Sequence, residues 1–165
     1  MTYEVDDDQY PSTTVIYIEA TWSGYGTSSG SGVLVGRNDI LTAAHVIYNA
    51  ERGGLADDIK LIPSYDPDAL NNVEVDWSMV HYYPDFDPDG DGQLFPGDFQ
   101  SDTLGQTELD IALFTLSEAV GDLYGWMGID YSFGGGSVGV LGHPGIYGRQ
   151  PMYDSGFVKR AEFND

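Results

Sequence analysis

The sequence predicts an all-β fold, a barrel or a sandwich built from short strands. Glycine, tyrosine and proline are abundant, at 22, 12 and 8 of 165 residues. No window carries a sustained apolar pattern at the i, i+3, i+4, i+7 spacing of an amphipathic helix. Short strand-like runs recur instead, and each is closed by turn residues, a pattern typical of small β-sandwiches and barrels.

The N-terminal half supplies the first expected strands. Residues 13–19 read Thr-Thr-Val-Ile-Tyr-Ile-Glu and precede the glycine-containing turn at 23–26, so a β-branched and aromatic run ends where the chain can reverse. Residues 32–36 and 40–42 are two apolar runs separated by Arg-Asn-Asp, which indicates a tight turn between two strands. Further strands are expected at residues 59–63, 73–77 and 79–83.

The C-terminal half continues the pattern after an interruption. Residues 85–101 combine carboxylates with glycine and proline, and we interpret them as an acidic insertion between strands. The run at 111–116 is the most apolar of the chain and predicts a buried strand. The last strands are expected at residues 137–142 and 155–160.

Composition excludes several function classes. Acidic residues outnumber basic ones 27 to 6, giving a net charge of −21; this excludes nucleic acid as a partner and argues against anionic membranes. No apolar run approaches the ~18 residues of a transmembrane helix, and the N-terminus lacks the features of a signal peptide, as a mature secreted chain also would. Cysteine is absent, which excludes disulfides, thiol catalysis and thiolate metal sites. The length fits one domain.

His45 is the first candidate catalytic residue. It follows Thr42-Ala-Ala at the end of the expected strand 40–42, where small residues allow a single helical turn to present an imidazole. Downstream, Asp110 stands at the mouth of the apolar run 111–116. A histidine and a buried-edge carboxylate placed in this way are what a nucleophilic hydrolase needs, because the carboxylate fixes the imidazole tautomer while the imidazole takes the proton of the nucleophile.

These segments resemble the trypsin/chymotrypsin-like serine proteases, and among them the bacterial glutamyl endopeptidases look nearest. Residues 31–47 match the strand–turn–Thr-Ala-Ala-His segment of that family, and residues 108–113 match its Asp-Ile-Ala-Leu segment. The resemblance implies that His45 is the general base and that Asp110 orients it. Asp110 follows His45 by 65 residues, against about 45 in the chymotrypsin template, and the acidic insertion accounts for the excess.

The nucleophile of that family has no counterpart in the sequence. No Gly-Asp-Ser-Gly-Gly motif occurs, and 55 residues follow Asp110, whereas the template places about 90 between the aspartate and the serine. Ser155, in Tyr-Asp-Ser-Gly-Phe, comes too early and aligns with a structural strand of the second barrel. The resemblance therefore implies one peptidase domain, residues 1–165, which stops before its nucleophile. It also implies a trypsin-like antiparallel double β-barrel with the first barrel complete and the second partial.

The acidic insertion predicts a structural calcium site. Asp87, Asp89 and Asp91 fall at positions 1, 3 and 5 of a twelve-residue loop with glycine at position 6. Gln93 would offer its backbone carbonyl at position 7, and Asp98 stands at position 12 in place of the usual glutamate. Calcium requires several hard oxygen ligands, which alternating aspartates supply. The alternative is a solvated acidic loop without a metal.

The function implied by the resemblance is peptide-bond hydrolysis by a serine endopeptidase acting on a protein or peptide, with His45 and Asp110 in this chain and the serine missing from it. A C-terminal segment or a second chain would complete the fold. Two alternatives stay open: a non-catalytic relative of the proteases, and a calcium-stabilised extracellular structural domain. The acidity, the absence of cysteine and the calcium loop fit an extracellular, secreted protein.

Overall fold

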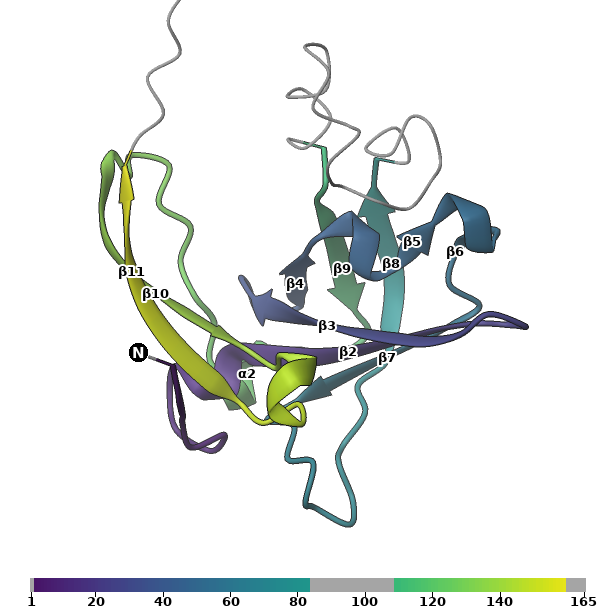
Figure 1. Cartoon of the computed structure of the whole chain (residues 1–165), viewed down its shortest axis with the longest axis horizontal. Coiled ribbons are helices and arrows are strands. Elements are labelled where there is room, and N and C mark those ends of the chain that lie inside the picture. The colour runs from purple at the N-terminus through teal and green to yellow at the C-terminus, as the bar shows by residue number, and fades with distance from the viewer. Residues whose placement is uncertain (1, 84–108, 160–165) are drawn as a thin grey trace, which may run out of the picture.

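The computed structural model describes residues 2–83 and 109–159, and nearly all of the regular structure there is β-strand (Figure 1). Its largest element is a six-stranded antiparallel sheet with the strand order β7-β2-β3-β4-β9-β8. The strands are β2 (Val15–Trp22), β3 (Gly26–Leu34), β4 (Asp39–Thr42), β7 (Asp58–Pro63), β8 (Trp77–Tyr82) and β9 (Ala112–Leu116). The all-β prediction is confirmed.

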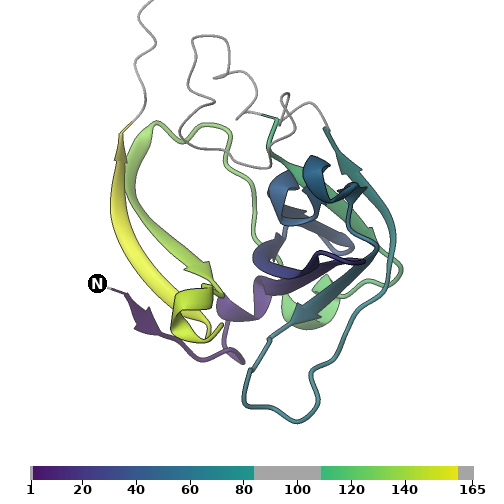
Figure 2. The same ribbon diagram turned by 45° about the vertical axis from the view of Figure 1, so that its right-hand side comes forward.

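This sheet curls on itself, as the two ribbon views show (Figures 1 and 2). An isolated antiparallel bridge between Leu61 and Val75 links β7 to the segment just before β8. The two edge strands of the sheet are thereby brought toward each other, which forms the first barrel. Glycine allows the tight curvature at one point, since a Cβ on Gly32 would lie 2.8 Å from the Ile40 side chain.

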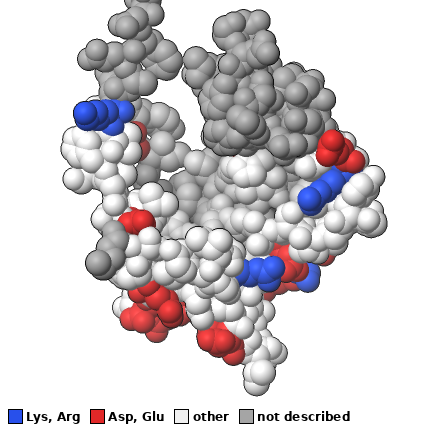
Figure 3. All heavy atoms as spheres, in the orientation of Figure 1, with Lys and Arg blue, Asp and Glu red and all other residues white. Residues whose placement is uncertain are grey.

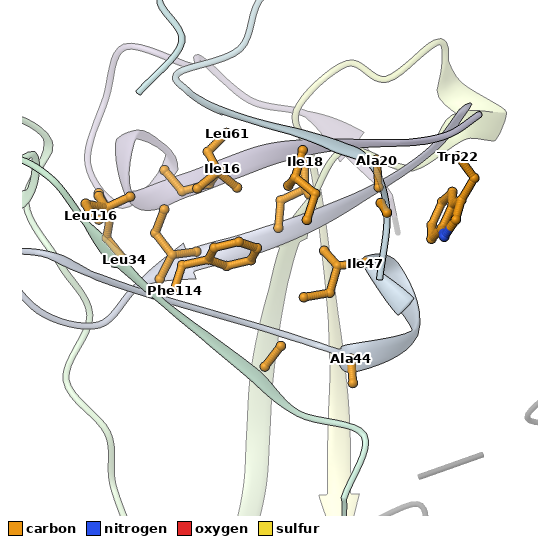
Figure 4. Packing of buried hydrophobic residues seen from close by; sticks show 14 residues of the cluster. Ile16, Ile18, Ala20, Trp22, Leu34, Ala44, Ile47, Leu61, Phe114 and Leu116 are labelled. Atoms are coloured by element: carbon orange, nitrogen blue, oxygen red, sulfur yellow. The ribbon is translucent and has the colours of Figure 1, made fainter. Parts of the chain in front are cut away.

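The core fills the inside of this curled sheet (Figure 4). Alternate residues of β2 point inward, because side chains of a strand alternate between its faces. They meet Phe114 of β9, which is fully buried and pairs in register with Ile40 of β4. The principal core residues are Ile16, Ile18, Ala20, Trp22, Leu34, Ile40, Ile47, Leu61, Phe114 and Leu116.

A second, three-stranded sheet has the order β1-β11-β10. It contains the long hairpin of β10 (Gly135–Gly142) and β11 (Met152–Lys159), with the short β1 (Tyr3–Glu4) on its edge. Figure 2 shows the hairpin arching away from the first sheet. Its apolar residues Val140 and Phe157 are 63% and 69% exposed, as expected of the beginning of a second barrel.

The hairpin meets the first sheet at β2 and β3 through polar and aromatic contacts. His143, just after β10, donates its backbone N–H to Ser31 Oγ at 2.8 Å. The His143 ring lies edge-on to Tyr17 and Tyr65, whose own rings stack with centroids 4.1 Å apart. Strand β2 is therefore covered on both faces, which explains why Tyr17 is 1% exposed although it points away from the first core.

Some expectations for individual elements were wrong. Residues 73–77 form no continuous strand: Val73 is 63% exposed, Val75 makes only the single bridge described above, and Trp77 is already the first residue of β8. The short elements β5 (Tyr48–Asn49), β6 (Gly54–Leu55) and α2 (Gly121–Tyr124) were not expected, because two to four residues are too few to show a periodicity. No helix in the described part of the chain is long and apolar enough to cross a membrane.

Candidate catalytic site

His45 lies on a single 3₁₀ turn, η2 (Ala44–Val46), that directly follows β4. Two anchors fix this turn. Thr42 donates its hydroxyl to the carbonyl oxygen of Ser31 at 2.9 Å, and Ala44 and Ile47 are fully buried in the core on either side of the histidine. The imidazole points outward with its side chain half exposed. The small residues before His45 thus allow a buried turn to present an accessible ring.

Asp110 lies next to His45 although it comes much later in the sequence. It precedes β9, whose first residue Ala112 pairs with Thr42, the last residue of β4. Because these strands are antiparallel, the end of β4 and the start of β9 lie at one edge of the sheet. The Asp110 Oδ2 and His45 Nδ1 atoms are 2.7 Å apart, and the His45 backbone N–H donates to Oδ1 at 2.9 Å. The structure therefore brings together two residues 65 positions apart.

The electrostatics of this pair favour an ionised carboxylate. Burial of Asp110, whose side chain is 11% exposed, by itself raises the pKa of the carboxyl. The hydrogen bonds from the His45 ring and backbone, together with the backbone of Ala44, outweigh burial and hold the pKa of Asp110 below its usual range. An ionised carboxylate only accepts hydrogen bonds, so Nδ1 of His45 is the donor, and in the neutral imidazole Nε2 then has the free lone pair. The ring is thus oriented to accept a proton at Nε2.

A pocket of about 520 Å³ opens beside the His45 ring. Its walls come from β3, from η2 and from the turn η3 (Ala50–Arg52) between β5 and β6. Its lining is more polar than apolar and includes Ser28, Ser29, Asn49 and Arg52 besides His45. We call this cavity the polar pocket. A second, mostly apolar groove of about 440 Å³ is lined by Leu41, Tyr82 and Ile111 among others.

The other residues named from the sequence lie elsewhere or outside the description. Ser155 sits in the middle of β11, paired with Gly139, as expected of a structural strand position. Asp87, Asp89, Asp91, Gln93 and Asp98 fall outside the described residues. No group of three or more potential metal-ligating His, Asp or Glu side chains occurs within residues 2–83 and 109–159. His81 is exposed on β8.

Sequence reasoning missed two residues of this region. Arg52 gave no signal, because an isolated arginine in a turn has no pattern around it, yet it lines the polar pocket. His143 stands in a segment whose sequence is typical of a turn, yet it is 4% exposed and its Nδ1 lies 3.0 Å from the carbonyl oxygen of Arg149. The Gly-His-Pro-Gly segment that contains it showed a turn and not the aromatic partners that cover it.

The burial of His143 predicts a pH-dependent stability. Burial lowers the pKa of this imidazole below the ordinary 6.5, while the Arg149 carbonyl and Asp7 partly oppose the shift. The imidazole of His143 therefore binds a proton more readily in the unfolded chain than in the folded one. The contribution of neutral His143 to the free energy of unfolding is full above about pH 6.5 and is lost as the pH falls below it. Thermal melts from pH 8 to 5 should therefore show a falling Tm. For a chain of this size, each kcal/mol lost from the free energy of unfolding lowers Tm by about 2–4 °C.

A matched variant identifies the group responsible. His143→Phe keeps an aromatic ring against Tyr17 and removes the titrating group, so its Tm should fall less between pH 7 and 5. Equal slopes in the original protein and His143→Phe would refute the assignment. The Asp110 contribution is lost at more acidic pH, below the ordinary carboxyl pKa of 3.8, and is thus separable.

Comparisons with known proteins identify the family and the fold of the chain. A family model described as trypsin-like peptidase domain matches residues 30–164. Among solved structures, a Glu endopeptidase in complex with MPD aligns with a TM-score of 0.68 at 22% identity, covering 98% of this chain and 69% of that one. The protease Anisep from Arthrobacter nicotinovorans aligns with a TM-score of 0.68 at 17% identity, covering 95% and 67%. The thermostable serine protease AL20 from an extremophilic microorganism gives 0.61 at 16%, covering 88% and 65%. No curated protein matches.

Proposed function

Because the chain belongs to the trypsin-like peptidase family, we propose that it provides the general base and the orienting carboxylate of a serine endopeptidase. The observation that carries this proposal is the 2.7 Å contact between His45 Nδ1 and Asp110 Oδ2, with the ring exposed and the carboxylate nearly buried. A hydrogen bond of this kind selects the tautomer whose Nε2 accepts a proton, which is the arrangement required for activating a hydroxyl nucleophile.

The chemistry follows from these two residues. A serine hydroxyl attacks the scissile carbonyl carbon while His45 Nε2 takes its proton, and the resulting imidazolium is stabilised by the Asp110 carboxylate. The same imidazolium then gives the proton to the leaving amine as the C–N bond breaks, leaving an acyl ester on the serine. Water hydrolyses the ester in a second cycle with His45 again as base. Asp110 remains ionised throughout, in keeping with its lowered pKa.

The proposal assigns the serine to residues outside this chain, in a continuation of the polypeptide or in a second chain. Within residues 2–83 and 109–159, the side chain of His45 hydrogen-bonds to Asp110 and to no serine hydroxyl. Ser31 lines the polar pocket too, but its hydroxyl accepts the backbone N–H of His143. The family resemblance supports a nucleophile beyond Asp110, in a second barrel that begins with the hairpin β10–β11.

A fluorophosphonate probe tests this directly, because it labels a serine only when a base activates it. The 165-residue chain should show no labelling and no hydrolysis of a peptide substrate. The product of the same gene extended downstream of the Asp165 codon should label at one serine and hydrolyse peptides. Hydrolysis by the 165-residue chain that is abolished by Ser155→Ala would contradict the assignment. An extended product that folds but never labels would favour a non-catalytic relative.

We also propose that the protein is secreted and that calcium stabilises it through Asp87, Asp89, Asp91, Gln93 and Asp98. Their spacing supports this proposal, together with the mutual repulsion of carboxylates in a chain of charge −21. Calcium at a hundredfold excess over Kd should add about 2.7 kcal/mol, which corresponds to a Tm increase of about 5–10 °C. Magnesium should substitute poorly because it demands a tight octahedral shell.

The measurement is a thermal melt with calcium, with chelator, and with chelator plus high salt. The double variant Asp89→Ala/Asp91→Ala should lose the calcium shift and keep the salt shift, since salt screens the general repulsion and not one loop. A calcium shift of equal size in both proteins would show that this loop does not bind the ion. Secretion is checked by the distribution of the protein between culture medium and cells.

A further inference from the structure

We propose that the polar pocket beside His45 is a substrate subsite for a carboxylate side chain, and that Arg52 selects it. The identification of the ligand as a peptide substrate rests on the proposed peptidase function. The pocket shares the His45 ring as part of its wall. Because the imidazole passes its proton to the leaving amine, a side chain in this pocket belongs to a residue within one or two positions of the scissile bond.

The charge of the pocket is opposite to that of the protein. The chain carries 27 acidic and 6 basic residues, and Figure 3 shows acidic side chains gathered over the lower part of one face. The described lining of the pocket nevertheless contains the Arg52 guanidinium and no carboxylate. A fixed positive charge within an acidic surface attracts anionic groups to that place.

Arg52 is held in place before any ligand arrives. Its backbone N–H donates to the side-chain oxygen of Asn49, which caps the turn η3. Its guanidinium Nη1 donates to Ser28 Oγ at 3.0 Å, and its Cζ lies 5.3 Å from the centre of the Trp22 ring. Trp22 is itself fixed, because it is 2% exposed and its indole N–H donates to the carbonyl oxygen of Gly54. A fixed guanidinium loses little conformational entropy on binding a carboxylate.

The guanidinium also retains donors for a ligand. Arg37 and Lys60 form ion pairs with Asp122 and Glu19, but Arg52 forms none with the carboxylates of the described residues. Its hydrogen bond to Ser28 uses one of five N–H groups. The remaining groups can bind both oxygens of a carboxylate, the pairing for which the planar guanidinium is suited.

Binding to the 165-residue chain tests this inference without any need for a nucleophile. The probes are blocked alanine tetrapeptides that carry one glutamate, or one glutamine at the same position, titrated into ¹⁵N-labelled protein and followed by NMR. For one position of the glutamate in the tetrapeptide, we expect the glutamate peptide to bind about five- to tenfold more tightly than the matching glutamine peptide. This ratio of affinities should fall at high salt. The Arg52 Nε–H and Trp22 indole N–H signals should shift most.

Matched variants separate selection from folding. Arg52→Gln should bring the glutamate-to-glutamine ratio to about one, and Arg52→Lys should retain part of it. Arg37→Gln removes the same charge elsewhere and should keep the full ratio. The ratio of the affinities for the glutamate and glutamine peptides is measured within each protein. A general loss of stability lowers both affinities equally and leaves this ratio unchanged. An equal ratio in the original protein and Arg52→Gln would overturn the subsite, as would an equal loss in Arg52→Gln and Arg37→Gln.

The subsite and the peptidase function can fail separately. If the ratio depends on Arg52 but no form of the protein with its downstream residues cleaves a peptide, the peptidase proposal fails and the carboxylate site stands. If the extended protein cleaves peptides and the ratio is indifferent to Arg52, the subsite fails and the peptidase proposal stands.

Discussion

His45→Ala is expected to lower kcat by about 10⁵- to 10⁶-fold in a form of the protein that carries its nucleophile serine. Removing the base leaves the hydroxyl protonated and leaves the leaving amine without a proton donor, and loss of the histidine in a comparable triad has an effect of about 10⁶. The fold should survive, because the imidazole is half exposed and the core contacts of the turn come from Ala44 and Ile47. Steady-state hydrolysis of a peptide substrate, with circular dichroism as a folding check, measures both.

His81→Ala is the matched control, since it removes an imidazole that lies exposed on β8. Its kcat should stay within about threefold of the original value, in line with the small effects of surface substitutions. A His45→Ala protein that keeps full activity would remove His45 from the mechanism, whatever the control shows.

Asp110→Asn is expected to lower kcat by about 10⁴-fold while leaving the fold nearly intact. The asparagine amide can still hydrogen-bond to the ring, but its NH₂ group would face Nδ1 and favour the tautomer with the proton on Nε2. That tautomer cannot accept the proton of the nucleophile, and the corresponding change in trypsin costs about 10⁴. The hydrogen bond from the His45 backbone N–H can be kept by the amide oxygen, which is the reason to expect a folded protein.

Asp122→Asn provides the comparison for this variant. Asp122 is half exposed and pairs with Arg37, a surface arrangement worth about 0–1 kcal/mol, so neither kcat nor stability should change much. If Asp110→Asn unfolds while its folded fraction remains fully active, Asp110 is structural and the base has no orienting partner. The pH dependence of kcat is a second measurement. The rate depends on the protonation state of the His45 imidazole, and the wrong tautomer changes it.

The fold was largely predictable because its strands are locally encoded. Residues 13–19 and 111–116 have β-branched and apolar character along their whole length, so a buried strand is the stable choice at both places. Residues 73–77 alternate apolar and acidic residues, which predicts a half-buried strand. A strand also needs a neighbour along its length, and here Val75 makes one bridge and Trp77 pairs only as the first residue of β8. That information lies in the path of the whole sheet and not in the five residues themselves.

The candidate site was likewise predictable only where the residues belong to a local sequence motif. His45 and Asp110 could be found because each stands in a motif of several residues, and their meeting follows once β4 pairs with β9. Arg52 could not be found, because its role depends on Trp22, Ser28 and a cavity assembled from three segments. The burial of His143 could not be predicted for a similar reason, since its aromatic neighbours come from β2 and from the loop after β7.

Ser31 is a common reference point for the two halves of the molecule. Its carbonyl oxygen accepts the hydroxyl of Thr42, at the end of the strand that leads to His45, and its hydroxyl accepts the backbone N–H of His143, at the end of the strand that begins the second sheet. A misplacement of about 1 Å between reacting groups can cost a hundredfold in rate. The alignment of the base with any nucleophile carried by the second sheet therefore depends on the position of Ser31 in β3.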